Sequence, residues 1–298
     1  MKKRMKNYCL YNPIAGNENS KEKLKKLSEI LTDGEVVFID VTKTTYSEVM
    51  PRINHEDKII ICGGDGTLNK FVNAVDKLPE NKIYLYATGT GNDFLTDIGG
   101  DKDQPVLINE YICDLPIVTV NGKDYKFING IGYGIDGYCC EVGDAMKAQG
   151  KKDINYAGIA VKGLLFKFKP RNAVITADGI EKTFKKVWLA PTMNGRYYGG
   201  GMIPTPDQAR LSDKGNVSVM VYYGSGKLKS LMVFPSIFKG EHVKHKEMVE
   251  VIEGDVITVK FDKPTALQID GETVLGVTEY TVRSRNAIKQ MQDKEISA

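Results

Sequence analysis

Cysteine and histidine are scarce in this chain, and neither forms a pattern typical of a metal site or a disulfide framework. Of the 298 residues, 5 are cysteine and 3 are histidine. The cysteine count is odd and no C-x-x-C spacing occurs, which argues against a disulfide scaffold and a structural zinc site. The motifs H-E-x-x-H and G-x-S-x-G are also missing, so zinc proteases and elbow-type serine hydrolases are excluded.

An excess of one charge and long apolar runs are missing as well. The 41 Lys and Arg residues against 38 Asp and Glu leave a net charge of only +3, so we expect no nucleic-acid partner. The longest apolar runs, such as Lys58–Cys62, are far shorter than the roughly 20 residues of a membrane-spanning helix. No apolar signal core follows the basic start at Met1–Lys6, and we therefore expect a cytoplasmic protein.

The first third of the chain alternates between strand and helix patterns. Hydrophobic residues are 42% of the chain, enough for a sizeable core, and the length suggests two domains at roughly 150 residues each. The almost wholly apolar run Lys58–Cys62 is typical of a parallel strand buried on both faces. These units predict a doubly wound α/β domain, with strands at Tyr8–Asn12, Glu35–Val41, Lys58–Cys62 and Lys82–Ala87 and helices at Ser20–Leu31 and Leu68–Leu78.

The remainder of the chain has mostly β-type patterns. Ile117–Val120 and Tyr125–Ile128 flank an Asn121-Gly122 pair, which predicts a hairpin. We therefore place a boundary between an α/β domain at 1–116 and a β-rich domain at 117–279. Further strands are expected at Ala173–Thr176, Val187–Met193, Val217–Tyr223, Val256–Phe261 and Ala266–Ile269, and helices at Ile154–Phe168 and Leu228–Ile237.

Two glycine-rich turns follow neighbouring predicted strands, at the sheet edge where open α/β folds bind ligands. They are Gly63–Thr67 and Thr88–Phe94. Their glycines permit close backbone approach to a phosphate, and the next helix offers N–H groups to an anion. Asp65 and Asp93 are suited to bind a metal ion, to orient a water molecule or to contact the acceptor substrate. Carboxylates beside such glycines point to metal-assisted phosphoryl transfer. The competing interpretation is a pair of sharp turns with a helix-capping Asp.

The motifs together resemble the diacylglycerol kinase catalytic family, in its soluble bacterial lipid-kinase branch. The matching runs include N-P-x-x-G at Asn12–Gly16, G-G-D-G-T-L-N at Gly63–Asn69, G-T-x-N-D-F at Gly89–Phe94 and I-D-G-E at Ile269–Glu272. The resemblance implies an N-terminal α/β domain, completed by residues 280–298, and a β-sandwich-rich C-terminal domain, with the active site in the interdomain cleft. It also implies transfer of the γ-phosphoryl group of ATP, with Mg²⁺, to a lipid hydroxyl, most simply that of diacylglycerol.

The resemblance also carries site residues onto this chain. Asp65, Asp93 and Asp114 match acidic positions of the family's cleft, and Asp270 and Glu272 match its catalytic carboxylates, one of which would be the general base. Asp270-Gly271 is equally consistent with a simple hairpin turn. The positions that match the family's ATP contacts are Asn12, Pro13, Ile14, Ala15, Gly16, Thr42, Gly63, Gly64, Asp65, Gly66, Thr67, Leu68, Asn69 and Thr90.

A structural metal site is implied in the second domain. Matching Leu211–Asn216 to the family's L-D-D-G stretch places Asp213 as the carboxylate ligand, with the carbonyl groups of Arg210 and Gly215. The chain departs from that pattern because Ser212 and Lys214 replace an Asp and a Gly. A lysine beside a divalent ion is unfavourable unless it points away.

A lipid acceptor requires contact with a membrane surface. Lys162–Lys169 and Leu231–Lys239 interleave bulky apolar residues with lysines, which predicts transient docking at an anionic interface. The same pattern fits amphipathic helices packed on a core. The sequence is also consistent with a homodimer. Two other functions remain as alternatives: an NAD kinase-like enzyme, which shares G-G-D-G-T, and a non-catalytic nucleotide-binding regulator.

Overall fold

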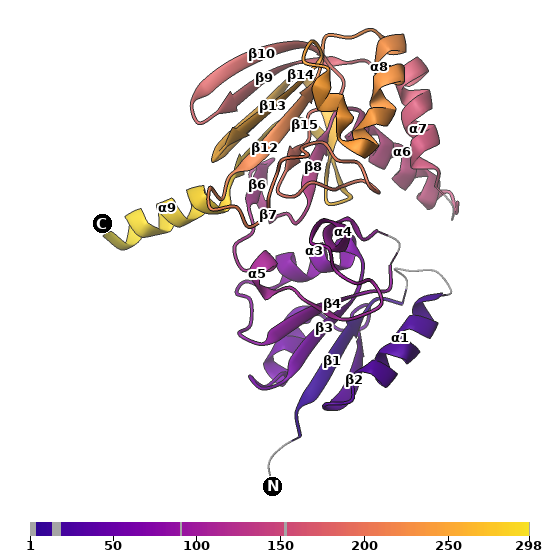
Figure 1. Cartoon of the computed structure of the whole chain (residues 1–298), viewed down its shortest axis with the longest axis vertical. Coiled ribbons are helices and arrows are strands. Elements are labelled where there is room, and N and C mark those ends of the chain that lie inside the picture. The colour runs from indigo at the N-terminus through magenta and orange to yellow at the C-terminus, as the bar shows by residue number, and fades with distance from the viewer. Residues whose placement is uncertain (1–3, 14–18, 90, 152–153, 298) are drawn as a thin grey trace. The chain divides into compact units, whose positions relative to one another are not determined.

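The computed structural model describes residues 4–13, 19–89, 91–151 and 154–297, and it divides into two compact units (Figure 1). The first unit comprises residues 1–114 and the second residues 115–298. The observed division lies two residues before the predicted one. No helix in the described part of the chain is long and apolar enough to cross a membrane.

The first unit is built on one five-stranded sheet with the order β2-β1-β3-β4-β5. The first four strands are parallel, and the short β5 pairs antiparallel with β4. The predicted strands are confirmed to within two residues. Their bounds are β1 Lys6–Tyr11, β2 Glu35–Asp40, β3 Lys58–Gly63, β4 Lys82–Ala87 and β5 Val106–Leu107.

Apolar side chains on both faces of this sheet are buried. Cys9 and Cys62 pack with Leu27 of α1 on one face, which confirms their interpretation as small core residues. Alternation along the strands sends Leu10 and Ile61 to the opposite face, and they are buried too. The helices of this unit are α1 Asn19–Ile30, α2 Tyr46–Val49, the 3₁₀ turn η1 Met50–Arg52, α3 Asp65–Ala74, α4 Asp93–Asp97 and α5 Asn109–Ile112.

The second unit is built on a ten-stranded sheet. The Asn121-Gly122 turn between β6 and β7 has φ values of 51° and 72°, the positive values that a two-residue hairpin loop requires. The main order is β13-β12-β11-β8-β14-β15-β6-β7, with β9 joining β14 to β10. The strands are β6 Ile117–Val120, β7 Lys123–Lys126, β8 Gly130–Tyr133, β9 Arg171–Ala177, β10 Ile180–Val187, β11 Thr192–Met193, β12 Val217–Tyr222, β13 Val249–Gly254, β14 Val256–Ile269 and β15 Glu272–Arg283.

Strand β14 connects two parts of this sheet. Its first half, Ile257–Phe261, pairs with β9, and its last residues, Leu267–Ile269, pair with β8. The register with β15 shifts between Lys260 and Leu267, and such irregularities bend a sheet. Side chains from β6, β8, β9, β12, β14 and β15 then share one apolar core.

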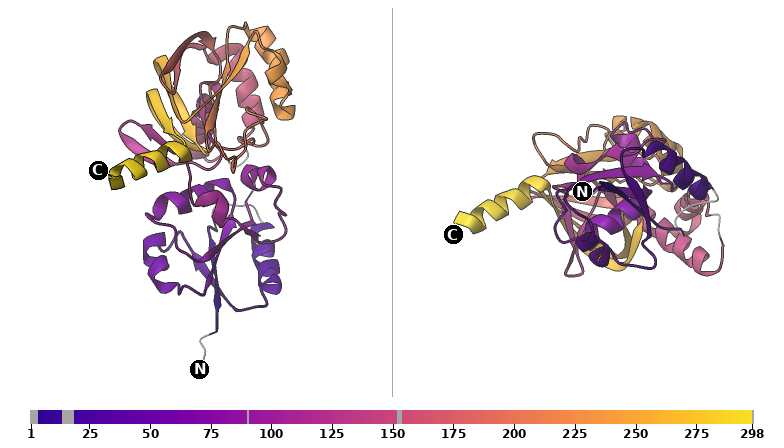
Figure 2. Two further views of the ribbon diagram at one scale, coloured as in Figure 1. Left: turned by 60° about the vertical axis from the view of Figure 1, so that its left-hand side comes forward. Right: turned by 90° about the horizontal axis from the view of Figure 1, so that it is seen from below.

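Helices cover a second core of this unit, and one of them was not predicted (Figures 1 and 2). α6 contains Gly137 and Gly143, which lower intrinsic helix propensity. Both are needed for packing, since a Cβ at Gly137 would lie 1.9 Å from the carbonyl oxygen of Ala266 and one at Gly143 2.6 Å from the Tyr156 ring. The helical segments are α6 Ile135–Ala148, α7 Tyr156–Lys162, the π-helical η2 Gly163–Lys167, α8 Lys227–Val233, the 3₁₀ turns η3 Phe234–Lys239 and η4 Glu241–Lys244, and α9 Arg285–Ser297.

The C-terminal segment belongs to the second unit, which corrects the expectation that residues 280–298 complete the first. Residues Tyr280–Arg283 pair with β6 in the large sheet. The start of α9 is held by Asp255, whose side chain accepts hydrogen bonds from Ser284 Oγ at 2.9 Å and Asn286 Nδ2 at 2.7 Å. Hydrogen bonds of this kind cannot be read from the local sequence pattern.

Candidate active site

The strand order of the first unit reverses between β1 and β3, and ligands of open α/β sheets bind at such a point. Asn12 and Pro13 follow β1, and Gly63–Asn69 lies at the end of β3 and the start of α3. Thr42 follows the edge strand β2 and is exposed, with its hydroxyl donating to Asp40 at 2.6 Å. The predicted nucleotide residues therefore gather at one sheet edge. Four of them, Ile14, Ala15, Gly16 and Thr90, lie outside the described residues.

The glycines of the two loops allow the loops to touch each other. A Cβ at Gly64 would lie 2.2 Å from the carbonyl oxygen of Gly91, and one at Gly89 would lie 2.9 Å from the nitrogen of Gly64. A Cβ at Gly63 would collide with the Thr67 side chain at 2.3 Å. A Cβ at Gly66, in contrast, would meet no atom within 4 Å, which leaves the backbone there accessible to a ligand.

Asp65 and Asp93 are brought together in this arrangement. Asp65 is the first residue of α3, and its Oδ2 accepts the backbone N–H of Asp93 at 2.8 Å while its Oδ1 accepts that of Phe94 at 3.2 Å. Its own N–H donates to the Gly91 carbonyl at 3.0 Å. Both aspartates are buried. The capping interpretation of Asp65 is thus correct, although the helix it caps is α4 and not its own.

The first turn of α3 faces inward. Thr67 and Asn69 are buried polar residues, and Leu68 is a fully buried core residue. The Leu68 N–H donates to the Gly64 carbonyl at 3.1 Å. The side chain of Leu68 therefore serves the core and is not available to a nucleotide. Thr67 and Asn69 retain oxygen and nitrogen atoms of the type that a phosphate or ribose binds.

Lys23 on α1 is a residue that sequence reasoning missed. Its Nζ donates to the carbonyl oxygen of Ala87 at 2.9 Å, at the end of β4, and the neighbouring Ser20 hydroxyl donates to the Thr88 carbonyl at 3.2 Å. The lysine thus places a positive charge next to the second glycine loop. No motif marks it, because the helical pattern of α1 shows only lysines on a polar face.

Asp114 closes the first unit, directly after α5. Its side chain is exposed, as is the neighbouring Cys113. Partial burial, and secondarily the charge of Asp114, raise the pKa of the Cys113 thiol. The hydrogen bonds observed between Asp65 and the start of α4 do not extend to Asp114.

The I-D-G-E run forms the tight turn between β14 and β15. Ile269 pairs with Glu272, and the two residues between them, Asp270 and Gly271, have φ values of 46° and 94°. The hairpin interpretation is therefore confirmed. It does not exclude a functional role, because the turn presents Glu272 as an exposed residue at the start of β15.

The side chain of Asp270 is occupied by backbone donors. Its Oδ2 accepts the N–H of Ile128 at 2.5 Å, and its Oδ1 accepts the N–H groups of Asn129 at 2.8 Å and Gly130 at 3.0 Å. A carboxylate that accepts three N–H groups is stabilised in its charged form and becomes a weaker base. Of the two predicted carboxylates, Glu272 is the better suited to accept a proton.

A partly buried acid on α6 supports the same turn. Gln268 donates from Nε2 to Asp136 Oδ2 at 2.8 Å, and its Oε1 accepts the N–H of Gly271 at 2.6 Å. Burial raises the pKa of Asp136 to about 6, and the bond from Gln268 offsets part of this shift. Asp136, Gln268 and Gly271 thus form a hydrogen-bonded chain from α6 to the turn that carries Glu272.

The predicted structural metal turn does not fit a divalent cation in this chain. The carbonyl oxygen of Ser212 accepts a hydrogen bond from the guanidinium of Arg285, and Lys214 adjoins the exposed Asp213. The guanidinium of Arg285 thus places a positive charge in the turn that opposes binding of a divalent cation, whereas the Lys214 ammonium group points away to Glu253. Among the residues described, no cluster of three or more His, Cys, Asp and Glu side chains suits a metal ion. The expected set of one carboxylate (Asp213) and two carbonyl groups (Arg210 and Gly215) has fewer acidic side chains than such a cluster, and it stays a prediction that the charge of Arg285 opposes.

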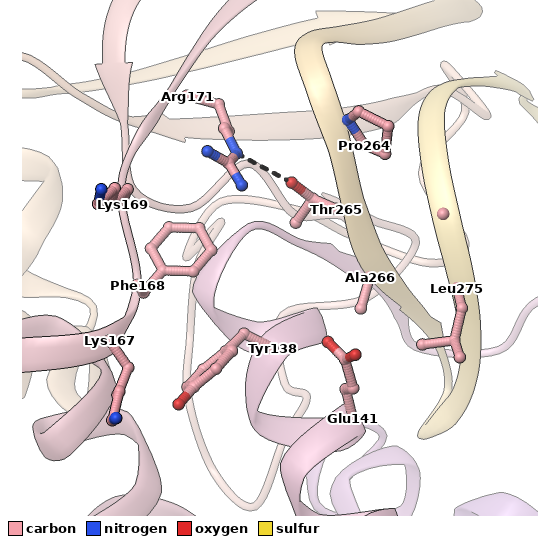
Figure 3. Close-up of a pocket in the computed structure, with 11 residues that line it drawn as sticks. Tyr138, Glu141, Lys167, Phe168, Lys169, Arg171, Pro264, Thr265, Ala266 and Leu275 are labelled. Atoms are coloured by element: carbon pink, nitrogen blue, oxygen red, sulfur yellow. Dashed lines mark hydrogen bonds between the residues drawn. The ribbon is translucent and has the colours of Figure 1, made fainter.

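A separate cavity of about 310 Å³ lies in the second unit (Figure 3). It is lined by Tyr138 and Glu141 of α6, by Lys167–Lys169, by Arg171 and by the β14–β15 ribbon. The Arg171 Nε donates to Thr265 Oγ1 at 3.3 Å across one side of it. The cavity contains none of the predicted catalytic residues, and its lining carries more basic than acidic side chains.

Comparison with known proteins identifies the family of this chain. Residues 6–119 match the diacylglycerol kinase catalytic domain, and residues 129–288 match the YegS C-terminal NAD kinase beta sandwich-like domain. The chain belongs to the bacterial diacylglycerol kinase family. The predicted resemblance and the predicted two-part fold are thereby confirmed.

Individual members of this family are similar over much of the chain. It is 28% identical over 202 residues to a diacylglycerol kinase of Mycobacterium tuberculosis, which covers 64% of this chain but only 63% of that protein, less than two thirds of its length. It is 25% identical over 280 residues to a Bacillus subtilis diacylglycerol kinase, covering 88% of each. A Bacillus anthracis diacylglycerol kinase structure aligns with a TM-score of 0.62 at 20% identity over 96% of each chain, a likeness of fold.

Proposed function

We propose that this member of the diacylglycerol kinase family is an ATP-dependent lipid kinase that phosphorylates diacylglycerol to phosphatidic acid. The observation that carries the proposal is the pair of buried acids, Asp65 and Asp93, joined by a hydrogen bond where the sheet order reverses. A purely structural turn has no need for two buried carboxylates at a ligand-binding edge. The similar proteins from M. tuberculosis and B. subtilis are named diacylglycerol kinases, which favours this acceptor over NAD⁺.

The acids fit a Mg²⁺ ion that arrives with the nucleotide. Kinases hold Mg²⁺ with one or two carboxylates and complete its shell with phosphate oxygens. Asp65 accepts the N–H groups of Asp93 and Phe94, and a carboxylate has more acceptor sites than these two bonds require. When bound, the ion would shield the phosphate charges. The accessible backbone at Gly66 and the ammonium group of Lys23 would bind the phosphates.

The acceptor side of the reaction falls to Glu272 in this proposal. Its carboxylate accepts the proton of the lipid hydroxyl as that oxygen forms a bond to the γ-phosphorus, and the bond between the γ-phosphorus and the bridging oxygen of ADP breaks. Asp270 supports the reaction indirectly, because its bonds to residues 128–130 hold the turn that carries Glu272.

One assay tests the proposal against both alternatives. Radiolabelled ATP is incubated with diacylglycerol, sphingosine, ceramide and NAD⁺, using wild type and Asp65→Asn. We expect label in phosphatidic acid with the wild type only. Label in NADP⁺ would replace the proposal by an NAD kinase, and ATP binding without any labelled acceptor would replace it by a nucleotide-binding regulator.

The enzyme must also reach a lipid, and we propose that η2 and α8 make this contact. Phe166, Leu228 and Met232 are 74%, 70% and 66% exposed. Leu228 and Met232 lie one turn apart on α8, which packs against η2. The Lys227 Nζ joins the two elements by donating to the Leu165 carbonyl at 2.8 Å. Exposed apolar side chains among lysines suit an anionic bilayer.

Neighbouring side chains of the same segments pack on the core, as the alternative interpretation expects. Leu164 and Phe168 are buried beside Phe166, and Ile237 is buried in η3. Pelleting with vesicles of neutral lipid or with added anionic lipid tests the docking. We expect stronger pelleting with anionic lipid. The double variant Phe166→Ser/Met232→Ser should lose this binding. The control Ile180→Ser, which changes an exposed residue of β10, should keep it. Equal pelleting under all conditions would refute electrostatic docking.

A further inference from the structure

The turn at residues 209–215, on which the family resemblance places a structural metal, is closed in this chain by hydrogen bonds of its own. The Ser212 N–H donates to the Ala209 carbonyl at 3.1 Å, and the Gly215 N–H donates to the Ser212 carbonyl at 3.0 Å. Gly215 has a φ of 60°, which suits glycine. The turn therefore has a defined backbone without any ion.

Arg285 supplies a positive charge to the centre of this turn. Its guanidinium donates to the Ser212 carbonyl oxygen, the same oxygen that closes the turn. The stem of the arginine lies against Gly215, because a Cβ at that position would be 3.0 Å from the Arg285 Nε and 3.2 Å from its Cγ. Glycine at 215 thus makes room for the arginine.

The arginine is itself fixed by the start of α9. Ser284 is fully buried, and its hydroxyl accepts the N–H of Ala287 at 3.1 Å, which caps the helix. The same hydroxyl donates to Asp255, which also accepts from Asn286. A guanidinium that projects from a capped and anchored helix loses less conformational entropy on binding than one on a free loop.

Lys214, the other departure from the family pattern, is directed to a different partner. Its Nζ lies 3.1 Å from Glu253 Oε2, which also accepts from Asn216 Nδ2 at 2.9 Å. These interactions lower the pKa of Glu253, with Lys214 the largest cause. Lys214 is therefore accommodated by an ion pair within the second unit, whereas the buried hydroxyl of Ser212 has no hydrogen-bond partner and only the backbone of that residue is bonded in the turn.

We propose that the guanidinium of Arg285 takes the structural role that relatives give to a divalent cation, so that this turn is independent of metal. The turn has a consequence for the site, because Arg210 within it donates to the Ile128 carbonyl and to Asn129 Oδ1, the latter at 2.6 Å. Ile128 and Asn129 in turn donate their N–H groups to Asp270. Through these hydrogen bonds, Arg285 helps to hold the Asp270-Gly271 turn that precedes Glu272.

Thermal unfolding without nucleotide tests this proposal and does not depend on kinase activity. We expect the Tm of the wild type to be the same in EDTA and in millimolar Mg²⁺, Mn²⁺ or Ca²⁺, and metal analysis to find no stoichiometric ion. Arg285→Ala should lower the Tm by about 3–6 °C, the scale of one lost charged hydrogen bond in a domain of this size. Lys289→Ala is the matched control, since it removes an exposed positive charge from the same helix.

Restoring the family pattern provides the converse test. In Ser212→Asp/Lys214→Gly/Arg285→Ala, we expect the Tm to rise by several degrees with divalent cations and to fall again in EDTA. All measurements are repeated with Asp65→Asn, so that ions bound in the first unit do not contribute. If the triple variant does not fold, Arg285→Lys replaces it, with an expected Tm between those of wild type and Arg285→Ala.

Three outcomes would overturn the proposal. They are a Tm of Asp65→Asn that rises with divalent cations, one equivalent of tightly bound metal in purified Asp65→Asn, or an Arg285→Ala variant with the Tm of the Lys289→Ala control. Each can occur whether or not the protein phosphorylates diacylglycerol, so failure of this proposal is distinguishable from failure of the proposed function.

Discussion

The carboxylate of Asp65 accepts the backbone N–H of Asp93 at 2.8 Å, so the acid that follows β3 holds the first turn of the helix that follows β4. The two glycine loops are therefore one structural unit, linked further by the bond from the Asp65 N–H to Gly91. A residue in this position contributes both to stability and to charge, and substitutions can separate the two contributions.

Asp65→Asn should lower turnover by at least about 10²-fold, because the charge needed for Mg²⁺ is lost. Its amide oxygen still accepts one backbone N–H, but its NH₂ group faces the other, so we also expect a loss of about 1 kcal/mol of stability. Asp65→Ala removes both acceptors and should in addition reduce the free energy of unfolding by about 1–2 kcal/mol, as expected for loss of a helix cap. Steady-state kinetics and urea unfolding check both expectations. Near-normal turnover of Asp65→Asn would contradict the catalytic role.

Glu272→Gln should reduce activity alone, whereas Asp270→Asn should reduce both activity and stability. Glu272 is exposed, so its substitution should reduce turnover by about 10²-fold or more with an unchanged Tm. Asp270→Asn places an NH₂ group against backbone donors at residues 128–130 and should lose about 1–3 kcal/mol of stability as well as activity. Kinetics and thermal unfolding of both variants test this assignment. It fails if Glu272→Gln retains wild-type turnover.

Lys23→Ala should weaken ATP binding by about 5–10-fold, because one positive charge near a phosphate contributes on the order of 1 kcal/mol. Lys26→Ala is a suitable control. Lys26 lies on the same helix and, like Lys23, is within 4 Å of Asp103, but only Lys23 also donates to the Ala87 carbonyl at the end of β4. Calorimetric titration with ATP measures the difference. Equal affinities of the two variants would exclude Lys23 from the nucleotide site.

The free energy of unfolding should depend on the titration of Asp136 between about pH 4 and pH 6. Burial raises its folded pKa from 3.8 to about 6, so the folded state keeps a proton that the unfolded chain has already lost. The free energy of unfolding therefore falls as the pH rises through this window, by up to about 3 kcal/mol from this group. Above pH 6 its contribution is constant.

Asp136→Asn should remove that slope, because its amide oxygen still accepts the bond from Gln268 and does not titrate. Urea unfolding at pH 4.5, 5.5 and 6.5 measures the difference between variant and wild type. Glu141→Gln, an exposed position on the same helix, is the control and should keep the wild-type slope. Parallel curves for wild type and Asp136→Asn would show that Asp136 does not titrate in this window.

Local signals in the sequence were sufficient for much of the architecture. Apolar runs bounded by turn residues predicted β1 to β4 to within two residues, since β1, β3 and β4 are largely buried and their composition reflects that burial, while the edge strand β2 is only partly buried. The Asn121-Gly122 pair predicted its hairpin for a similar reason, because positive φ values restrict the residue choice. The glycine loops and the family motifs were also evident from residues close together in the chain.

Contacts between distant residues account for what the sequence did not reveal. α6 was missed because its two glycines oppose helix formation locally and are explained only by the close approach of Ala266 and Tyr156. The occupied carboxylate of Asp270, the position of Lys23 at β4 and the guanidinium at Ser212 each join segments at least 60 residues apart. The sequence motifs by themselves carried the resemblance to the family and located its loops. Which acid is held by backbone donors, and which cation braces the turn, was decided only by the tertiary structure, since such bonds depend on how the folded chain brings their partners together.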